Sequence, residues 1–362
     1  MGEETARARF ACPACGGEAA WHPQRRKLVC THCGTESSAP AGAEDAPVEH
    51  DLGAALDELA GAPRGWQAQK RSVRCQSCRA VSVLDASRQA QHCEFCGAAQ
   101  LLEYSESEPA FRPGSVLPFA IDAAQARERI RQWYGRRWLA PSALKRRALT
   151  DTVHGVYLPY WTFDARAEVR WSAEAGHYHY ETEMRIRDGR PRAEQVRKVR
   201  WTPASGTLTH RFDDDLVCAS VGVREALVRG IEPFPTATLE PYDPAFVAGW
   251  VVERYQVDLP AAVLRAREAM DRKLLALCAA RVPGDTHRNL RVAAQWSEQT
   301  FKHVLMPVWL LTYDYGRRSY QCAMNGVTGR IAGDYPKSPW KVAALALAAL
   351  VLFAVLASLS GR

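Results

Sequence analysis

The sequence of 362 residues predicts an α+β protein in three parts. Two copies of a four-cysteine pattern lie in the first third of the chain. Between residues 153 and 332, long stretches alternate polar and apolar side chains, which indicates antiparallel strands, and helical patterns lie between them. An uncharged apolar run lies near the C-terminus. We therefore expect two cysteine-rich modules, a largely antiparallel α+β body over 115–335 and a C-terminal helix over 342–359.

Eight of the eleven cysteines form the two copies, which are offset by 63 positions. In each copy, fourteen residues separate two CxxC pairs. The eight residues are Cys12, Cys15, Cys30, Cys33, Cys75, Cys78, Cys93 and Cys96. Two thiolates of one CxxC turn reach the same tetrahedral ion, and two such pairs complete a four-thiolate shell. The pattern predicts two structural Zn²⁺ ions, one in a zinc ribbon over 10–36 and one in a second ribbon over 71–102.

Each ribbon is too short to bury a useful core, so bound metal must supply about 10–16 kcal/mol of folding free energy. Three alternatives are less favoured. A rubredoxin-like iron site usually has a longer gap between its CxxC pairs, and a thioredoxin-type redox pair needs one CxxC beside a βαβ unit. Disulfides need an oxidising compartment, and no apolar signal segment precedes Cys12. Four thiolates leave no open coordination position, so we expect no catalytic metal.

The remaining cysteines, Cys218, Cys278 and Cys322, lie in apolar or strand-like contexts and are expected to be ordinary buried thiols.

Val342–Leu359 contains eighteen residues without a charge. At about 1.5 Å per residue, such a helix spans roughly 27 Å, which matches a bilayer core. Trp340 and Lys341 stand at its start, as at a membrane interface. The alternative is a buried core helix, which usually carries a polar stripe. We expect a single-pass helix in the cytoplasmic (inner) membrane, with the N-terminal bulk in the cytoplasm.

Residues 37–70 are expected to form a linker with a short helix around Leu52–Leu59. After the second ribbon, Val116–Phe119 predicts a short strand. Asp122 is a plausible N-cap for a helix through Trp138, and a second helix is expected over Ser142–Leu149.

The sequence of the body predicts both strands and helices. Strands are expected over Val156–Arg170, Ala173–Arg187, Glu194–Thr209, Leu290–Trp296, His303–Tyr315, Ser319–Asn325 and Thr328–Ala332. Helices are expected over Val223–Arg229 and Ala261–Ala280. Asp188-Gly189 indicates a hairpin, and Asn325-Gly326 predicts a tight type I′ turn.

Two segments of the body resemble each other: Val156–Trp161 and Val304–Trp309 share their Val, Pro and Trp positions. Because proline donates no ladder hydrogen bond, both strands are expected to begin at a sheet edge or to carry a bulge. Either the domain is duplicated, with two matched pockets, or two similar strands use tryptophan as core filler. The second interpretation is favoured.

Basic and aromatic residues are mixed in one region, Arg127–Arg147. They are Arg127, Arg129, Arg131, Arg136, Arg137, Lys145, Arg146 and Arg147, with Trp133, Tyr134 and Trp138. This mixture suits nucleic acid or anionic lipid, and it also occurs on ordinary solvated helices. The formal charge of +7 falls to about +3 when each loaded four-thiolate site contributes about −2. The choice between lipid, nucleic acid and water stays open.

Other polar groups give weaker signals. His177 and His179 share one face of a strand, but no third ligand is placed by the sequence, so an exposed polar face is favoured over a metal site. The run Asp213–Asp215 favours a solvent-facing or capping turn over a Mg²⁺ site. The motifs GxxxxGK[ST], GxSxG, HExxH and GxGxxG are absent, so no enzyme of those types is expected.

Several stretches together are typical of one family. They are CPACGG and LVCTHCGT, CQSC and CEFCGA, VLPF, GVYLPYW, MPVW, and MNGVTGRIAGDYPKS before the terminal run. In these the chain resembles bacterial zinc-ribbon membrane proteins, often labelled primosomal protein N′ (helicase)-like or TFIIB-type zinc ribbon-containing proteins. The resemblance covers most of the chain and implies that the eight paired cysteines bind zinc. It implies architecture rather than activity, since the motor motifs of a helicase are missing.

These observations favour a non-enzymatic adaptor, anchored in a lipid bilayer, whose paired ribbons and body form a cytoplasmic platform for a protein partner. The alternative is a membrane-tethered nucleic-acid-binding protein linked to replication or transcription, which would use the ribbons and the Arg127–Arg147 region.

Overall fold

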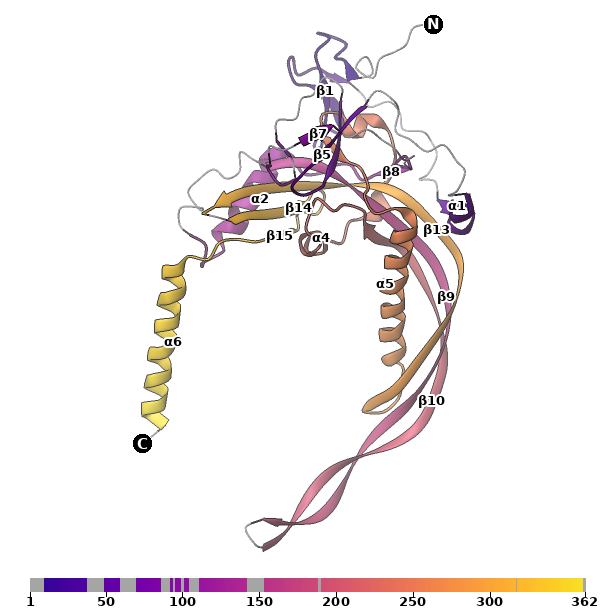
Figure 1. Ribbon diagram of the computed structural model, residues 1–362, viewed down its shortest axis with the longest axis vertical. Coiled ribbons are helices and arrows are strands. Elements are labelled where there is room, and N and C mark those ends of the chain that lie inside the picture. The colour runs from indigo at the N-terminus through magenta and orange to yellow at the C-terminus, as the bar shows by residue number, and fades with distance from the viewer. Residues whose placement is uncertain are drawn as a thin grey trace.

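The computed structural model describes residues 10–37, 49–58, 70–85, 92–93, 95–98, 101–103, 111–141, 153–187, 190–316 and 318–360. The helix predicted over Ser142–Leu149 and most of the predicted linker lie outside these ranges. Figure 1 shows the two ribbons at the N-terminal end of a sheet-rich body. A long curved hairpin and a C-terminal helix extend from the opposite side of that body.

The strands form two sheets in the described part of the chain. A three-stranded sheet holds β1 (Ala19–His22), β2 (Lys27–Cys30) and β3 (Glu36–Ser37). The large sheet holds β4 (His50–Asp51), β5 (Lys70–Cys75), β6 (Val81–Asp85), β7 (Leu101–Glu103), β8 (Ser115–Val116), β9 (Val153–Arg187), β10 (Arg190–Cys218), β11 (Glu240–Pro241), β12 (Val251–Glu253), β13 (Thr286–Tyr315), β14 (Arg318–Asn325) and β15 (Ile331–Gly333). The mixed, mostly antiparallel α+β body was therefore predicted correctly.

The helices are short except for three. They are α1 (Leu52–Glu58), α2 (Ala123–Gly135), α4 (Glu225–Ile231), α5 (Leu259–Ala279) and α6 (Pro339–Ser360), with 3₁₀ turns η3 (Thr236–Thr238) and η4 (Pro244–Val247). Asp122 caps α2 as predicted, because its Oδ1 accepts from the Gln125 amide at 2.8 Å. The α2 helix ends at Gly135 rather than Trp138.

The centre of the large sheet is the antiparallel pair β9–β13, which joins the two sequence segments that resemble each other. Val156 faces Val308 and Tyr160 faces Val304. Two short strands flank this pair in parallel: β12 aligns Val251 with Val156, and β8 aligns Ser115 with Val304. Each flanking contact thus uses the equivalent position of its segment, so the arrangement has an approximate two-fold relation.

The two prolines lie inside the sheet, so the expectation of an edge or bulge at each was wrong. On β9, Pro159 falls between the last residue paired with β12 (Tyr157) and the first paired with β10 (Tyr160). On β13, Pro307 falls between the β8 pairing, which ends at Leu305, and the β14 pairing. At both positions the neighbouring strand changes, so no ladder partner requires the missing N–H.

The tryptophans of the two segments make equivalent hydrogen bonds to backbone carbonyls. Trp161 Nε1 donates to the Val257 carbonyl at 2.9 Å, and Trp309 Nε1 donates to the Ile121 carbonyl at 3.1 Å. Each carbonyl immediately precedes an aspartate N-cap, Asp258 for α5 and Asp122 for α2. Short strand, capped helix and long hairpin therefore occur twice, and each tryptophan bonds to the other copy. The structure favours a duplicated unit over the simpler interpretation.

Two further expectations need correction. The predicted separate strands of the hairpins are continuous, since β9 covers 35 residues and β13 covers 30. The predicted tight Asn325-Gly326 turn is instead a wider loop in which Asn325 Oδ1 accepts from the amides of Val327 and Thr328. The positive φ that this loop needs falls at Gly329 (+75°). The hairpin around Asp188-Gly189 is confirmed by the pairing of Arg190 with Arg187.

Both faces of the central pair are buried. On one face, α5 packs residues spaced four apart, Ala262, Ala266, Met270, Leu274 and Cys278, against β9 and β10. On the same face, Ala126, Ile130 and Tyr134 of α2 pack against Tyr157 and Trp309. The opposite face is covered by α4 and by Phe95, which share a cluster with Val156, Leu158 and Val304. Cys278 and Cys322 are fully buried and Cys218 is partly buried, which agrees with ordinary packed thiols.

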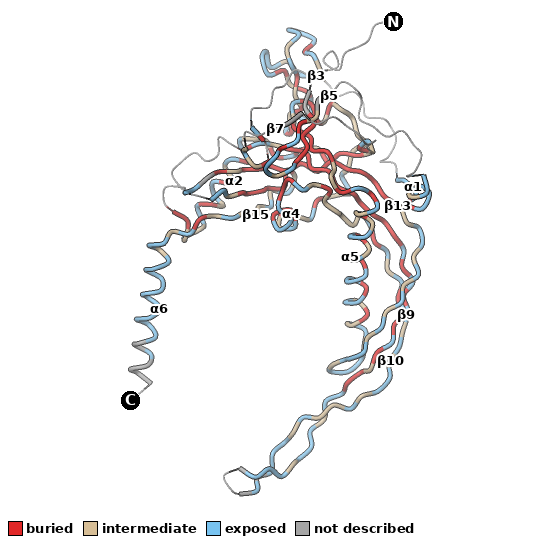
Figure 2. Tube along the Cα trace, viewed as in Figure 1, coloured by how far each residue is buried: buried red, intermediate tan, exposed pale blue. Residues whose placement is uncertain are grey.

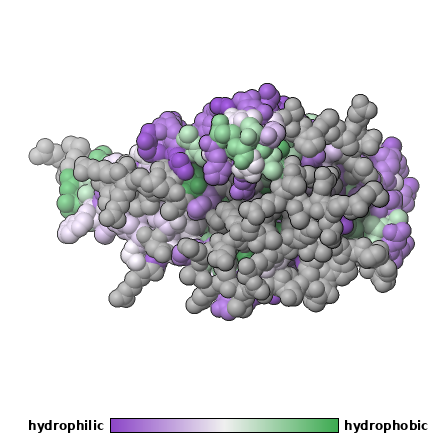
Figure 3. All heavy atoms as spheres, turned by 90° about the horizontal axis from the view of Figure 1, so that it is seen from above, coloured by the Kyte–Doolittle hydropathy of each residue, from purple (hydrophilic) through white to green (hydrophobic). Residues whose placement is uncertain are grey.

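Two projections leave this body. β13 accompanies β9 only as far as Gly176, and beyond it β9 and β10 continue as a two-stranded ribbon. The described part of α6 is exposed, and so is most of this ribbon (Figure 2). Among the described residues, no helix has both the length and the apolar character that crossing a bilayer requires, so the transmembrane helix expected over 342–359 is not supported. Seen from above, at the end of the body that carries the two cysteine-rich ribbons, hydrophilic residues surround a smaller hydrophobic group (Figure 3).

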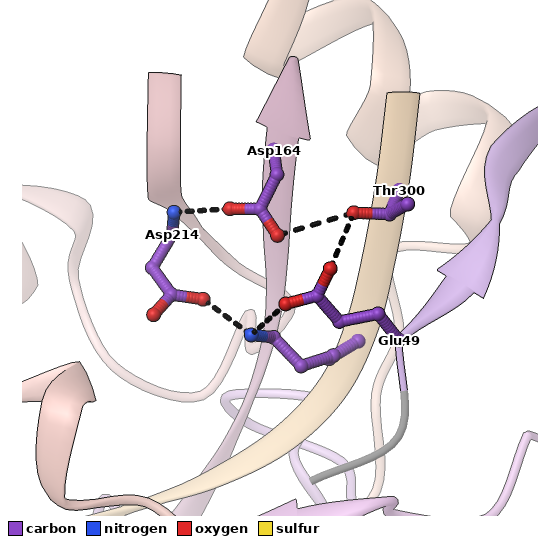
Figure 4. A network of polar contacts seen from close by, with 5 residues as sticks. Glu49, Asp164, Asp214 and Thr300 are labelled. Atoms are coloured by element: carbon purple, nitrogen blue, oxygen red, sulfur yellow. Dashed lines mark hydrogen bonds and ion pairs between the residues drawn. The ribbon is translucent and has the colours of Figure 1, made fainter. Parts of the chain in front are cut away.

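Two bulges in the large sheet meet at a buried lysine (Figure 4). The bulge in β10 places Asp214 at φ +51°, where its carboxylate lies 2.8 Å from Lys302 Nζ. Glu49 also pairs with Lys302, at 3.1 Å. Thr300 follows the bulge in β13, and its hydroxyl lies 3.0 Å from a Glu49 oxygen and 3.1 Å from an Asp164 oxygen, sharing its one hydrogen between them. The lysine is 8% exposed, so these carboxylates compensate a charge that would otherwise be buried alone.

His303 gives the fold a specific pH dependence. Burial against Trp161 and Tyr255 lowers the pKa of His303 to about 4. In the unfolded chain a histidine takes up its proton near pH 6.5. Between about pH 6.5 and pH 4 the unfolded state therefore binds more protons, and the stability falls as the pH falls, by roughly 3 kcal/mol at most.

We expect His303→Gln to weaken this part of the pH dependence in urea unfolding measured at pH 7 and pH 5. His287→Gln, at an exposed position of the same strand, serves as the control and should keep the wild-type dependence. An unchanged difference between the two pH values in His303→Gln would show that this histidine is not the source.

Candidate metal centres

The four CxxC turns have one backbone geometry. In each, the amide four residues after the first cysteine donates to the carbonyl of that cysteine, at 2.8–3.1 Å. The donors are Gly16, Gly34, Arg79 and Gly97, and all four have positive φ, between +64° and +75°. Glycine adopts this conformation at low cost, which explains its recurrence after three of the pairs. Arg79 adopts it without that advantage.

The turns bring the eight predicted cysteines together in the two predicted groups, called site 1 (Cys12, Cys15, Cys30, Cys33) and site 2 (Cys75, Cys78, Cys93, Cys96). Within each group all sulfurs lie within 4.8 Å of one another. The shortest Sγ–Sγ distances are 3.5 Å in site 1 and 3.5 Å in site 2. A tetrahedral ion with metal–sulfur bonds of about 2.3 Å requires sulfurs about 3.8 Å apart, whereas a disulfide requires about 2.05 Å. Both groups therefore fit a metal ion.

Backbone amides also approach the sulfurs of site 1. The Gly17 amide donates to Cys15 Sγ and the His32 amide donates to Cys30 Sγ, both at 3.4 Å. Such bonds favour thiolate over thiol and orient the ligand. A side chain at Gly17 would meet the His32 ring at 2.7 Å, so the close packing of the two turns requires glycine there.

Ribbon 1, residues 10–37, rests on the surface of the body. Trp21 is buried, packs edge-on against Phe246 at 4.8 Å, and donates its amide to the Ala248 carbonyl at 3.2 Å. The contact forms a small separate cluster with Ala245 and Ala248. On the other side, the site 1 turns are open to solvent, since Cys15 and Cys33 are exposed.

Ribbon 2 is integrated into the body. Its β6 strand pairs with β12, which extends the large sheet to β5 and β7. Phe95, between Cys93 and Cys96, is fully buried in the main core, and its carbonyl accepts from Thr312 at 2.9 Å and Gln321 at 2.6 Å. None of the site 2 cysteines is exposed. Site 2 therefore supports the body directly, whereas site 1 does not.

Sequence reasoning missed one residue beside ribbon 2. Glu253, the last residue of β12, is completely buried. Burial raises the pKa of Glu253 to about 8, although the nearby Ser220 and Gln256 act in the opposite direction. The first unit of the duplication has Leu117 at the equivalent place. A surface-type residue inside a short strand gave no periodic signal by which to find it.

The other candidates occupy ordinary environments. His179 lies 3.3 Å from Glu181, on the polar face of a strand, and no metal group in the described chain includes a histidine. Asp214 pairs with Lys302 rather than with a cation site. In the Arg127–Arg147 region, Arg137 stacks on Trp133 at 4.3 Å. Residues 142–147 of that region lie outside the described residues.

No family model matches the chain, and no solved structure matches it. The chain is 27% identical over 337 residues to "Uncharacterized protein YdjG" of Bacillus subtilis (strain 168), and the alignment covers 92% of each chain. The similarity thus extends over most of the length of both proteins.

The difference between the two sites predicts different results for Cys33→Ser and Cys96→Ser, which are equivalent ligands. Each variant should lose one of two bound metal ions, measured by elemental analysis. Only Cys96→Ser should destabilise the body, because Phe95 would lose its fixed position in the core, and removing such a packed side chain costs about 3–5 kcal/mol. Equal body stability in the two variants, measured by urea unfolding, would contradict the integration of ribbon 2.

Proposed function

We propose that the protein is a non-enzymatic, zinc-containing adaptor held at a membrane by α6, with ribbon 1 presented to a protein partner. One observation carries this proposal. The exposed site 1 turns lie on one side of the body, and α6 extends from the opposite side (Figure 1). The resemblance to bacterial zinc-ribbon membrane proteins supports the same assignment.

Zinc is the proposed ion at both sites. Four thiolates in a closed tetrahedral arrangement suit Zn²⁺, and they leave no position for a substrate. The ions would therefore stabilise the turns rather than carry out chemistry. In a bacterial cell the thiolates would remain reduced in the cytoplasm, which we propose as the compartment of the ribbons and body.

Two features support contact of α6 with lipid. Exposed apolar side chains lie on all sides of the helix, since Leu345, Leu347, Leu350, Leu352 and Phe353 are each more than half exposed. At its base, Lys341 Nζ donates to the carbonyls of Trp138 and Ala140, which fixes α6 to the segment after α2.

The base of α6 also has the composition of a membrane interface. Trp340 and Trp138 are 85% and 57% exposed, and Lys337 and Arg136 lie close to them in the sequence. Exposed tryptophan beside basic residues is typical of the headgroup region. This placement favours lipid over nucleic acid for the basic residues near α2.

The ribbons themselves favour a protein partner over nucleic acid. Trp21 and Phe95 are buried in contacts with the body, and no Phe, Trp or Tyr in the described parts of the ribbons is exposed. Single-stranded nucleic acid is usually held by stacking on exposed aromatic rings. The site 1 turns offer instead a small rigid surface that includes Pro13 and Ala14.

Membrane attachment is tested by fractionating cells that produce the full chain. We expect wild type in the membrane pellet after alkaline carbonate, and Leu350→Asp/Phe353→Asp in the soluble fraction, because each buried aspartate costs about 2.5–3.5 kcal/mol near the bilayer centre. Leu264→Asp, at a leucine of α5 that is 68% exposed, is the matched control and should pellet. Wild type in the soluble fraction would refute the attachment.

The adaptor role is tested by affinity purification of the full chain from detergent extracts. The variant Pro13→Glu/Ala14→Glu alters the exposed site 1 turn and leaves all eight cysteines in place. We expect it to lose at least one protein that wild type and an Arg265→Glu control on α5 both retain, measured by quantitative mass spectrometry. The same partners in all three samples would exclude ribbon 1 as the partner surface.

A further inference from the structure

The distal part of the β9–β10 hairpin, residues 177–187 and 190–199, is here called the distal ribbon. It has only two strands, because the last β13 contact on β9 is Gly176. A two-stranded ribbon is marginally stable in water unless one face is covered. The rest of β9 is covered, since α5 and β13 accompany it.

The two faces of the distal ribbon differ in character. One face is apolar and aromatic: Tyr178, Tyr180, Thr182, Met184 and Ile186 alternate along β9, opposite Val199, Arg197, Gln195, Ala193 and Pro191 of β10. The other face carries ion pairs. Lys198 Nζ lies 2.7 Å from Glu181 and 2.8 Å from Glu183, and Arg185 lies 3.8 Å from Glu194.

The apolar face has no cover within the described chain. Tyr180, Met184 and Ile186 are 64%, 67% and 80% exposed. Three large exposed side chains on one face of one strand, interrupted only by Thr182, are far from the scattered exposure that needs no explanation. On the other face, Lys198 and Arg185 have carboxylate partners, so the apolar face is the one that requires a partner.

Three observations identify the partner as lipid. The distal ribbon and α6 extend from the same side of the body, away from ribbon 1 and ribbon 2 (Figure 1). The sequence 177–200 holds seven Lys and Arg against four Asp and Glu, a net charge of +3 that suits anionic headgroups. Arg197 lies over the Tyr178 ring at 4.4 Å, and tyrosine with arginine is a typical interfacial combination.

The backbone limits how deep the distal ribbon goes. No described strand pairs with either of its outer edges, and edge N–H and C=O groups without partners cannot enter the hydrocarbon core. A position in the headgroup region satisfies those edges with water and still buries the tyrosine, methionine and isoleucine side chains.

We propose that the apolar face of the distal ribbon binds the headgroup region of an anionic bilayer as a second membrane contact beside α6. The inference rests on the membrane attachment proposed above and extends it. Two contacts far apart in the sequence would fix the orientation of the body more firmly than one helix alone. The site 1 turns would then point away from the lipid.

The test uses the full chain reconstituted in vesicles of phosphatidylglycerol and phosphatidylethanolamine, with p-benzoylphenylalanine at one position at a time. Position 186 reports on the apolar face, position 181 on the polar face of the same ribbon, and position 350 on α6. After irradiation, mass spectrometry identifies the adducts. We expect lipid adducts at positions 186 and 350 and none at position 181.

Each other outcome has a separate meaning. Lipid adducts at position 350 without any at position 186 would overturn the inference and leave the α6 anchor standing. A cross-linked dimer through position 186 would also overturn it, because a second copy would then cover the face. No lipid adduct at position 350 would refute the anchor itself. Loss of the adduct at position 186 in vesicles of phosphatidylcholine alone would support the contribution of the anionic headgroups.

Discussion

The antiparallel pairing of β9 with β13 is the interaction on which the rest of the structure depends. It brings together two similar segments, and each supplies a tryptophan that bonds the strand–helix connection of the other unit. Neither unit completes its own core, because Trp161 needs Val257 and Trp309 needs Ile121. The short strands β8 and β12 then find parallel places beside the pair. The other elements are placed by this frame: α2 and α5 pack on one face of it and α4 on the other, ribbon 2 pairs with the edge of β12, and the distal ribbon extends β9.

This frame gives the two metal sites different roles. Site 2 joins the sheet through β6 and the core through Phe95, so the free energy of metal binding is shared with the body. Site 1 rests on a small contact around Trp21 and leaves its turns free. The same chemistry thus serves as an internal support in one ribbon and as a rigid exposed surface in the other. The two elements proposed to contact the membrane, α6 and the distal ribbon, begin on the far side of the frame from the site 1 turns.

Much of this was readable in the sequence, because local chemistry fixes it. The cysteine spacing determined both metal groups, glycine after three of the pairs met the positive φ of the turn, and Asp122 capped its helix. Features that depend on distant partners were missed. Pro159 and Pro307 are tolerated inside the sheet only because neighbouring strands change there, and no local pattern reveals such a change. The buried Lys302 and Glu253 also look like surface residues until the strands beside them are known.

The central claim is that one rigid body holds the site 1 turns away from the bilayer and the distal ribbon against it. Resonance energy transfer from a fluorophore on the full chain to acceptor lipids in anionic vesicles measures this directly. A donor at Ala14, introduced as a non-canonical amino acid, should transfer weakly, and a donor at Ile186 should transfer strongly. Strong transfer from Ala14, or equal transfer from both positions, would contradict the claim.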